Sequence, residues 1–441
     1  MFQSILNLIF PEKAFFWGYA EKIARSISGP ISIFFVVIFL DLKSQGYLFT
    51  FISLLAIKFV LELGLTQIII TFVAYEKNSL DIKKNFLKGR FNNYLRLKNI
   101  SRYAFFWFFW ASLIYIGILN LVGFLLFNSA GDPYDFWFPP FLLLCVLSAI
   151  EIFFIPFYAV KEGLAKIDEV YKYKFYKTIL FLIAYLALLS IGADIWSYSV
   201  ALFLNVIVDF IFVMKNKSLF LSLIRIVKGQ VSRLNWKTEI FPMQSRIAIG
   251  AISGVLSFSI FTPFSFNLLG PETAGRVGLT VAIVTGISTL SVVPSMVSSQ
   301  KIASLVEQKN IRMLDNLIVR LLTLSFAIHF FSLLILIVLF YLLEEFFPFI
   351  LEKVLDPKSF LLFFFAMMFS LISTPLSIFM RAHKEEPLMW LSIFTGLFIC
   401  FGSYFGMYFY GAIGAALTFF VVTFLSFPIL ISIFFRFRSR Y

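Results

Sequence analysis

The stretch Leu-Leu-Gly-Pro-Glu-Thr-Ala-Gly-Arg-Val-Gly-Leu, residues 268–279, separates two long apolar runs by a turn. Gly-Pro-Glu breaks a helix, because proline cannot continue one and glycine permits backbone angles that other residues avoid. The flanking runs, 247–269 and 277–300, are each long enough for a helix to cross the hydrocarbon core of a bilayer. The stretch therefore predicts a hairpin between two transmembrane helices.

The composition extends this prediction to the whole chain. Hydrophobic residues make up 60% of the 441 residues, charged residues make up only 14%, and phenylalanine alone occurs 61 times. A soluble domain of this size cannot bury so much apolar surface. The apolar runs are continuous and do not alternate with polar residues as the strands of a membrane barrel do. We therefore predict an all-α polytopic membrane protein with about twelve transmembrane helices.

The positions of the basic residues predict the orientation. If the N-terminus is cytoplasmic, the loops and tail on that side carry 28 of the 37 Lys and Arg residues, whereas the opposite loops carry only Lys43, Lys353 and Lys358. Positive residues concentrate on the cytoplasmic side of membrane proteins, so we expect both termini inside. The net charge of +13 is then mainly topological. It suits anionic lipid headgroups, and nucleic acid is not an expected partner.

An internal repeat divides the chain. Arg25-Ser-Ile-Ser-Gly29 opens one apolar segment, and Arg246-Ile-Ala-Ile-Gly250 opens another. Leu40 precedes Gly46 by the same spacing that separates Leu269 from Gly275. Because the repeat starts at the first and the seventh span, it predicts two pseudo-symmetric six-helix bundles of the same orientation. The expected parts are an N-terminal bundle, a cytoplasmic amphipathic linker and a C-terminal bundle, at 1–214, 215–240 and 241–441.

Two basic residues in the N-terminal half are candidates for a cationic cavity, because an ion at membrane depth must face protein or water. The uncharged run 27–40, which begins two residues after Arg25, has only 14 residues and is too short to cross the bilayer alone. Arg25 either lines a cavity or pairs with Glu21, four residues earlier. Lys58 lies near the middle of the second predicted span, 46–75, where it either lines a cavity or pairs with Glu62.

Arg246 and Arg276 are two further candidates for the same cavity. The apolar runs that follow them are each long enough to span the bilayer without the arginine. Each side chain therefore either lines a cavity or extends to a membrane interface, Arg246 on the inside and Arg276 on the outside. An arginine on the outer side runs against the charge distribution of the rest of the chain.

Glu62, Glu151 and Asp209 are candidates for ion coupling, because a buried carboxyl group can carry a proton or hold sodium. His329, in the middle of the ninth predicted span, can carry a proton in the same way. The alternative for Glu151, Asp209 and His329 is a structural side chain whose polar atoms are satisfied inside the protein. The sequence has no nucleotide-binding motif, nucleophile elbow or His/Cys cluster, so we expect neither an enzyme nor a metal site.

Several stretches resemble the lipid-linked oligosaccharide flippases of the O-antigen (Wzx) type. That family belongs to the multidrug/oligosaccharidyl-lipid/polysaccharide (MOP) exporter superfamily, together with the multidrug and toxin extrusion (MATE) transporters and the lipid II flippase. The similar stretches are Ala24-Arg-Ser-Ile-Ser-Gly-Pro30, Gln45-Gly-Tyr-Leu-Phe-Thr-Phe51 with Glu62-Leu-Gly-Leu-Thr-Gln67, Val160-Lys-Glu-Gly-Leu-Ala-Lys-Ile-Asp-Glu-Val-Tyr171 and Leu269-Gly-Pro-Glu-Thr-Ala-Gly-Arg-Val-Gly-Leu279. The later spans match the family in hydropathy.

The resemblance implies a MATE-like fold with a central cavity, and a flippase that works by alternating access in the bacterial cytoplasmic (inner) membrane. The implied substrate is an undecaprenyl-pyrophosphate-linked oligosaccharide, the repeat unit of an O-antigen in lipopolysaccharide or of a capsule. Arg25, Lys58, Arg246 and Arg276 would bind its pyrophosphate, since basic side chains suit phosphate oxygens. An H⁺ or Na⁺ gradient, and no cofactor, would supply the energy. Membrane lipids and other polysaccharide assembly proteins are the further partners expected.

The alternative function is a MATE-like ion-coupled antiporter that exports drugs or small metabolites. Such transporters tend to place an acidic residue in the first span to handle cations, whereas here the first span carries Arg25 and its apolar part has no carboxylate. A membrane enzyme such as a polysaccharide polymerase is a third class. It would need a sizeable outer loop, and the sequence shows none.

Overall fold

The computed structural model describes residues 13–77, 80–83, 86–89, 91–224, 236–383 and 385–440. Within these residues, twelve helices are long and apolar enough to cross a membrane, which confirms the predicted all-α polytopic fold. The spans are Phe16–Phe39, Leu42–Glu62, Asn92–Asn128, Tyr134–Gly163, Ile167–Ser190, Trp196–Lys215, Ile247–Leu269, Pro271–Glu307, Ile311–Phe346, Pro357–Ala382, Met389–Tyr410 and Ala412–Arg438.

The helices form two compact units, which we describe separately. Unit 1 comprises the described residues up to Ser32 and those of Leu55–Ala251, and unit 2 comprises Ile33–Leu54 and the described residues from Ile252 onward. Most of residues 1–214 thus lie in unit 1 and most of residues 241–441 in unit 2, but residues 33–54 belong to unit 2. The division into bundles in chain order stays a prediction.

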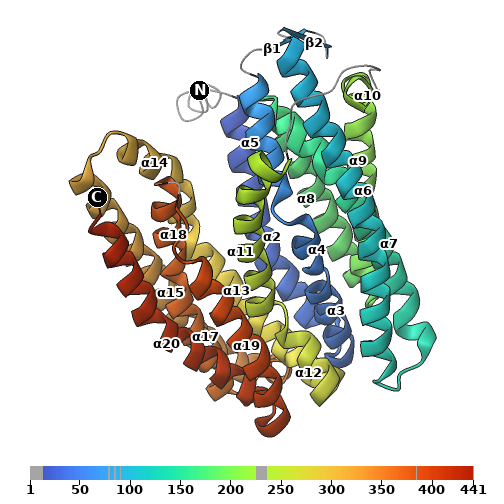
Figure 1. Cartoon of the computed structure of the whole chain (residues 1–441). Coiled ribbons are helices and arrows are strands. Elements are labelled where there is room, and N and C mark those ends of the chain that lie inside the picture. The colour runs from blue at the N-terminus through green and yellow to red at the C-terminus, as the bar shows by residue number, and fades with distance from the viewer. Residues whose placement is uncertain are drawn as a thin grey trace, which may run out of the picture. The chain divides into compact units, whose positions relative to one another are not determined.

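Unit 1 is built around α6, α7, α8 and α9, with α6 packed on α7 and α9 packed on both α7 and α8. It contains most of the elements coloured blue to green in Figure 1. Its elements are the first part of α2 (Lys13–Phe39), α4 (Ile57–Glu62), α5 (Leu65–Lys77), β1 (Leu80–Lys83), β2 (Phe86–Gly89), α6 (Phe91–Asn128), α7 (Tyr134–Gly163), α8 (Ile167–Ser190), α9 (Trp196–Lys215), α10 (Lys217–Ile224), the π-helix Trp236–Ile240 and the first part of α11 (Phe241–Phe258).

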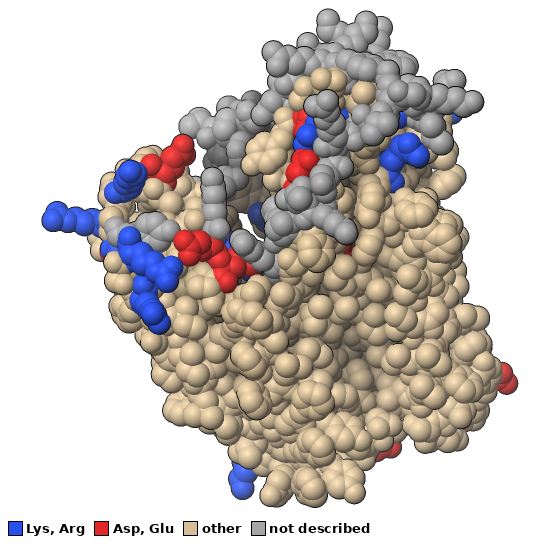
Figure 2. All heavy atoms as spheres, in the orientation of Figure 1, with Lys and Arg blue, Asp and Glu red and all other residues tan. Residues whose placement is uncertain are grey.

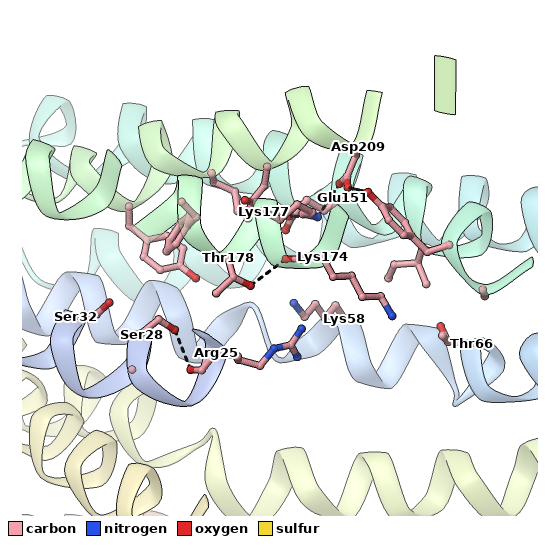
Figure 3. Close-up of a pocket in the computed structure, with 18 of the residues that line it drawn as sticks. Arg25, Ser28, Ser32, Lys58, Thr66, Glu151, Lys174, Lys177, Thr178 and Asp209 are labelled. Atoms are coloured by element: carbon pink, nitrogen blue, oxygen red, sulfur yellow. Dashed lines mark hydrogen bonds and ion pairs between the residues drawn. The ribbon is translucent and has the colours of Figure 1, made fainter. Parts of the chain in front are cut away.

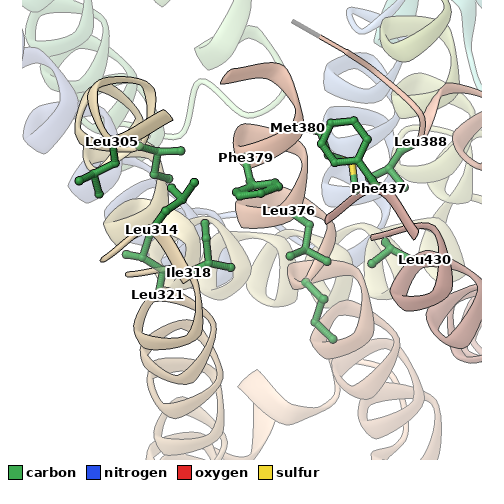
Figure 4. Packing of buried hydrophobic residues seen from close by; sticks show 12 residues of the cluster. Leu305, Leu314, Ile318, Leu321, Leu376, Phe379, Met380, Leu388, Leu430 and Phe437 are labelled. Atoms are coloured by element: carbon green, nitrogen blue, oxygen red, sulfur yellow. The ribbon is translucent and has the colours of Figure 1, made fainter. Parts of the chain in front are cut away.

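Unit 2 is held together by α13, which packs on α3 and α12, and by α20, which packs on α17 and α19. One end of the unit contains a cluster of buried apolar residues from α14, α15, α18 and α20 (Figure 4). Its elements are the end of α2, α3 (Leu42–Leu54), the end of α11, α12 (Phe261–Leu269), α13 (Pro271–Val297), α14 (Ser299–Glu307), α15 (Ile311–Phe346), α16 (Pro348–Leu351), α17 (Pro357–Leu371), α18 (Ser373–Ala382), α19 (Met389–Tyr410) and α20 (Ala412–Arg438).

The surface of the spans is apolar. Large side chains such as Phe106, Ile335 and Phe398 are more than half exposed, although they lie in the middle of long helices. On the face drawn in Figure 2, a broad area carries almost no Lys, Arg, Asp or Glu. A soluble protein does not expose an apolar area of this extent, whereas a bilayer covers it at no cost.

The second span is broken at two points, so the prediction of one continuous helix over 46–75 is wrong. Residues 55–56 form a turn between α3 and α4, and α4 ends after only six residues. Leu63 and Gly64 then adopt left-handed backbone angles, with φ of 48° and 68°, which stop the helix before α5. Two side chains of α6 donate hydrogen bonds to carbonyl groups near the breaks: Tyr115 OH to Leu55 and Trp107 Nε1 to Leu61.

The two glycines of the internal repeat lie in a helix crossing of unit 2. A Cβ on Gly46 of α3 would overlap the carbonyl oxygen of Pro271, one turn before Gly275 on α13. In return, a Cβ on Gly275 would lie 2.5 Å from the carbonyl oxygen of Leu42, one turn before Gly46. Each glycine thus lets the other helix approach its backbone, and the contact is reciprocal, as expected for a pseudo-twofold relation between repeats.

The C-terminal end of α2 is capped by side chains of unit 2. Lys353 Nζ donates to the carbonyl groups of Val37 and Leu40 at 2.7 and 2.6 Å, and Gln45 Nε2 also donates to Leu40. The negative end of the helix dipole stabilises a cation at this position. Lys353 lies between two spans, and burial lowers the pKa of its ammonium group.

Candidate functional site

Unit 1 contains a cavity of about 450 Å³, lined by residues of α2, α4, α5, α7, α8 and α9 (Figure 3). Charged side chains are frequent in its wall, although most of these elements belong to candidate membrane spans. The basic residues are Arg25, Lys58, Lys174 and Lys177, and the acidic residues are Glu151, Glu162 and Asp209. Charges inside a membrane protein are expensive and usually mark a pathway or a binding site.

Arg25 reaches the cavity from α2. Its guanidinium pairs with Glu21 four residues earlier, and its side chain is 70% exposed, so most of its donors stay accessible. The two alternatives for Arg25 therefore both apply, because it pairs with Glu21 and also lines the cavity. In Figure 3 its guanidinium extends toward the same space as the Lys58 side chain.

Lys58 reaches the cavity from α4, the short helix between the two breaks. Among the described residues, it forms no ion pair, and the predicted pair with Glu62 is absent. Its ammonium lies 5.4 Å from the centre of the Phe59 ring. Glu62 is half-buried at the end of α4 and is not a lining residue.

Lys177 of α8 is held between two carboxylates. Its Nζ lies 3.0 Å from Glu151 Oε1 of α7 and 2.8 Å from Asp209 Oδ2 of α9. Tyr158 OH donates to the other oxygen of Asp209 at 2.7 Å. The predicted ion-coupling residues Glu151 and Asp209 thus lie together, and a lysine that the sequence reasoning missed occupies the space between them.

Lys174, one turn before Lys177, also faces the cavity and was also missed. Its Nζ pairs with Glu162 Oε2 at 3.0 Å, and Tyr171 OH donates to the same carboxylate. Both lysines were counted among the 28 basic residues of the cytoplasmic loops and tail. Because α8 begins at Ile167, they instead lie on one face of a membrane helix. Their spacing of three residues was the only available signal.

The structure does not bring all the predicted site residues together. Arg276 belongs to unit 2, where it is half-buried on α13, and it is not among the residues that line this cavity. Arg246 lies in α11, but its side chain is outside the described residues. His329 is fully buried in unit 2, where one ring nitrogen lies 3.2 Å from the carbonyl oxygen of Phe364 and the ring stacks on Phe364.

Comparison with known proteins shows similarity in fold. No family model and no curated protein matches the chain. A structure of a multidrug resistance MATE family transporter of the MOP superfamily in its inward-facing conformation matches with a TM-score of 0.61 at 15% identity, over 94% of this chain and 96% of that chain. The lipid II flippase MurJ in an inward closed conformation matches with a TM-score of 0.63 at 14% identity, over 95% of this chain and 90% of that chain.

A third similar structure is a MOP superfamily transporter from Pyrococcus furiosus, described as having a binding pocket of reverse polarity that suggests a different function. It matches with a TM-score of 0.55 at 13% identity, over 97% of this chain and 94% of that chain. At these identities the comparisons show the fold alone. The chain has the fold of MOP superfamily transporters, and its substrate has to be inferred from the cavity.

Proposed function

We propose that this protein is a flippase that moves an undecaprenyl-pyrophosphate-linked oligosaccharide across the bacterial cytoplasmic membrane by alternating access. The observation that carries the proposal is the pair of accessible cations, Arg25 and Lys58, in one cavity among the spans. Lys58 forms no direct ion pair among the described residues, so its ammonium can accept an anionic partner. A cargo with a pyrophosphate group would supply one.

Arg25, Lys58 and Lys174 would contact the phosphate oxygens, and Arg246 and Arg276 remain predicted binding residues for the same group. The carried glycan would be the repeat unit of an O-antigen or a capsule, received from and passed to other polysaccharide assembly proteins. An H⁺ or Na⁺ gradient would drive the transport cycle. The residues predicted to couple the ion to transport are Glu62, Glu151 and Asp209. Two of these, Glu151 and Asp209, already pair with Lys177.

The test is replacement of Arg25 by alanine and of Lys58 by methionine in cells whose surface polysaccharide depends on this gene. We expect both variants to lose surface polysaccharide and to accumulate lipid-linked oligosaccharide facing the cytoplasm, at unchanged protein levels. Lys22→Ala is the matched control, because Lys22 is exposed on the same helix as Arg25 and does not line the cavity. Normal polysaccharide in both cavity variants would sink the proposal.

A MATE-like antiporter is the second candidate, and the similarity in fold to MATE transporters favours it. A cationic drug in this cavity would be repelled by Arg25 and Lys58, and the carboxylates of Glu151 and Asp209 are engaged by Lys177. Efflux of a cationic dye from vesicles that contain the protein would separate the two functions. Efflux by the wild type would oppose the flippase function. Efflux that persists in Glu151→Gln would also show that Glu151 is not needed for the antiport.

A further inference from the structure

The two carboxylates that hold Lys177 differ in their access to the cavity. The Asp209 side chain is only 1% exposed, whereas the side chains of Glu151 and Lys177 are each 20% exposed. Asp209 is also fixed on its other oxygen by Tyr158. Asp209 therefore holds Lys177 from the more buried side, and Glu151 holds it from the more exposed side of the cavity wall.

We propose that Glu151 is a replaceable counter-ion, and that the anionic group of the cargo takes its place on Lys177. The inference rests on the proposed function, because it requires an anionic cargo in this cavity. A phosphate oxygen offers the lysine ammonium the same charge and the same kind of hydrogen-bond acceptor as Glu151 does. Lys177 keeps its pair with Asp209 during the exchange, so the buried cation is never left without a counter-ion.

The exchange gives Glu151 a definite role in the transport cycle. When the cavity is empty, Glu151 neutralises Lys177 and supports the packing of α7 against α8. When an anion arrives, it must compete with Glu151 for the ammonium, which lowers the affinity of the cavity. A carrier has to release its cargo as well as bind it, and a competing carboxylate that returns to Lys177 favours release.

The inference predicts that removing a carboxylate strengthens anion binding. Inorganic pyrophosphate serves as the probe, and its binding to the full chain in lipid nanodiscs is measured by calorimetry. We expect Glu151→Gln to bind pyrophosphate about tenfold more tightly than the wild type. The reason is that pyrophosphate no longer has to displace a carboxylate from the Lys177 ammonium. Adding Lys177→Gln to Glu151→Gln should abolish the gain.

Asp209→Asn is the matched control. It removes the same negative charge from the lining of the same cavity, so a general electrostatic effect would raise the affinity as much as Glu151→Gln does. The exchange predicts a clearly smaller gain, because Asp209 is not displaced by the cargo. Glu151→Asp keeps the negative charge but weakens the contact with Lys177. Its affinity for pyrophosphate should lie between those of the wild type and Glu151→Gln. Thermal unfolding of each variant shows whether it is folded.

The outcomes separate this inference from the proposed function. A wild-type protein that does not bind pyrophosphate would overturn both. Wild-type binding that weakens in Lys58→Met, together with an unchanged or weaker affinity in Glu151→Gln, would overturn the exchange and leave the cationic cavity. Equal gains in Glu151→Gln and Asp209→Asn would also overturn the exchange, because they would reflect charge alone.

Discussion

Gly275→Ala tests whether the glycine crossing of α3 and α13 determines the packing of unit 2. The new Cβ would lie 2.5 Å from the carbonyl oxygen of Leu42 and 3.2 Å from the backbone nitrogen of Gly46. Ordinary contacts of a Cβ begin at 3.4 Å, so the two helices would have to separate by about 0.9 Å at this point. Both blocking atoms belong to the backbone, and no side-chain rotation can relieve the clash.

We expect the overpacking to cost about 1–3 kcal/mol. Alanine regains roughly 0.5–1 kcal/mol relative to glycine in a helix, which leaves a net loss of about 1 kcal/mol at the middle of these ranges and about 2.5 kcal/mol at most. The assay is thermal unfolding of the detergent-solubilised protein, followed by tryptophan fluorescence, in which Gly275→Ala should have a lower Tm. Gly286→Ala is the control on the same helix, because its Cβ meets nothing within 4 Å. A Gly275→Ala protein as stable as Gly286→Ala would refute the reasoning.

Two further predictions concern side chains that donate to carbonyl groups. Trp107→Phe removes the hydrogen bond to Leu61 at the end of α4, so it should cost about 1 kcal/mol in thermal unfolding and weaken pyrophosphate binding through Lys58. Lys353→Met removes two charge-assisted hydrogen bonds and should cost about 2 kcal/mol. The pKa of Lys353 is lower in the folded state than in the unfolded state, so the unfolded state binds the proton more readily. Rising pH therefore disfavours unfolding of the wild type. The difference in free energy of unfolding between the wild type and Lys353→Met should grow from pH 7 to pH 10. A constant or shrinking difference would contradict this sign.

The spans could be predicted from the sequence because length and hydropathy are sufficient to define a membrane helix. The repeat that ends at Gly46 and Gly275 was a weak signal in the sequence, yet both glycines lie in one crossing of unit 2. The break after Glu62 was missed, although Gly64 is part of it. Glycine is tolerated in membrane helices, so its presence alone does not distinguish a break from a packing site.

The cavity could be predicted only in part. Arg25 and Lys58 were recognisable because a charge inside an apolar run stands out. Lys174 and Lys177 were not, because a polar stretch at the start of α8 has the composition of a loop. The pairing of Lys177 with Glu151 and Asp209 joins residues 26 and 32 positions away in the sequence, and only the packing of three helices determines such a contact.

The crossing of α3 and α13 also constrains how the protein is made. About 220 residues separate α3 from its partner, so at roughly 5–20 residues per second the ribosome needs some tens of seconds before α13 exists. During that interval α3 lacks the helix that will cover it. Two polar side chains of α3 do not need α13 for their hydrogen bonds. Thr50 donates to the carbonyl of Gly46 and Gln45 donates to that of Leu40, and both acceptors are synthesised before α13.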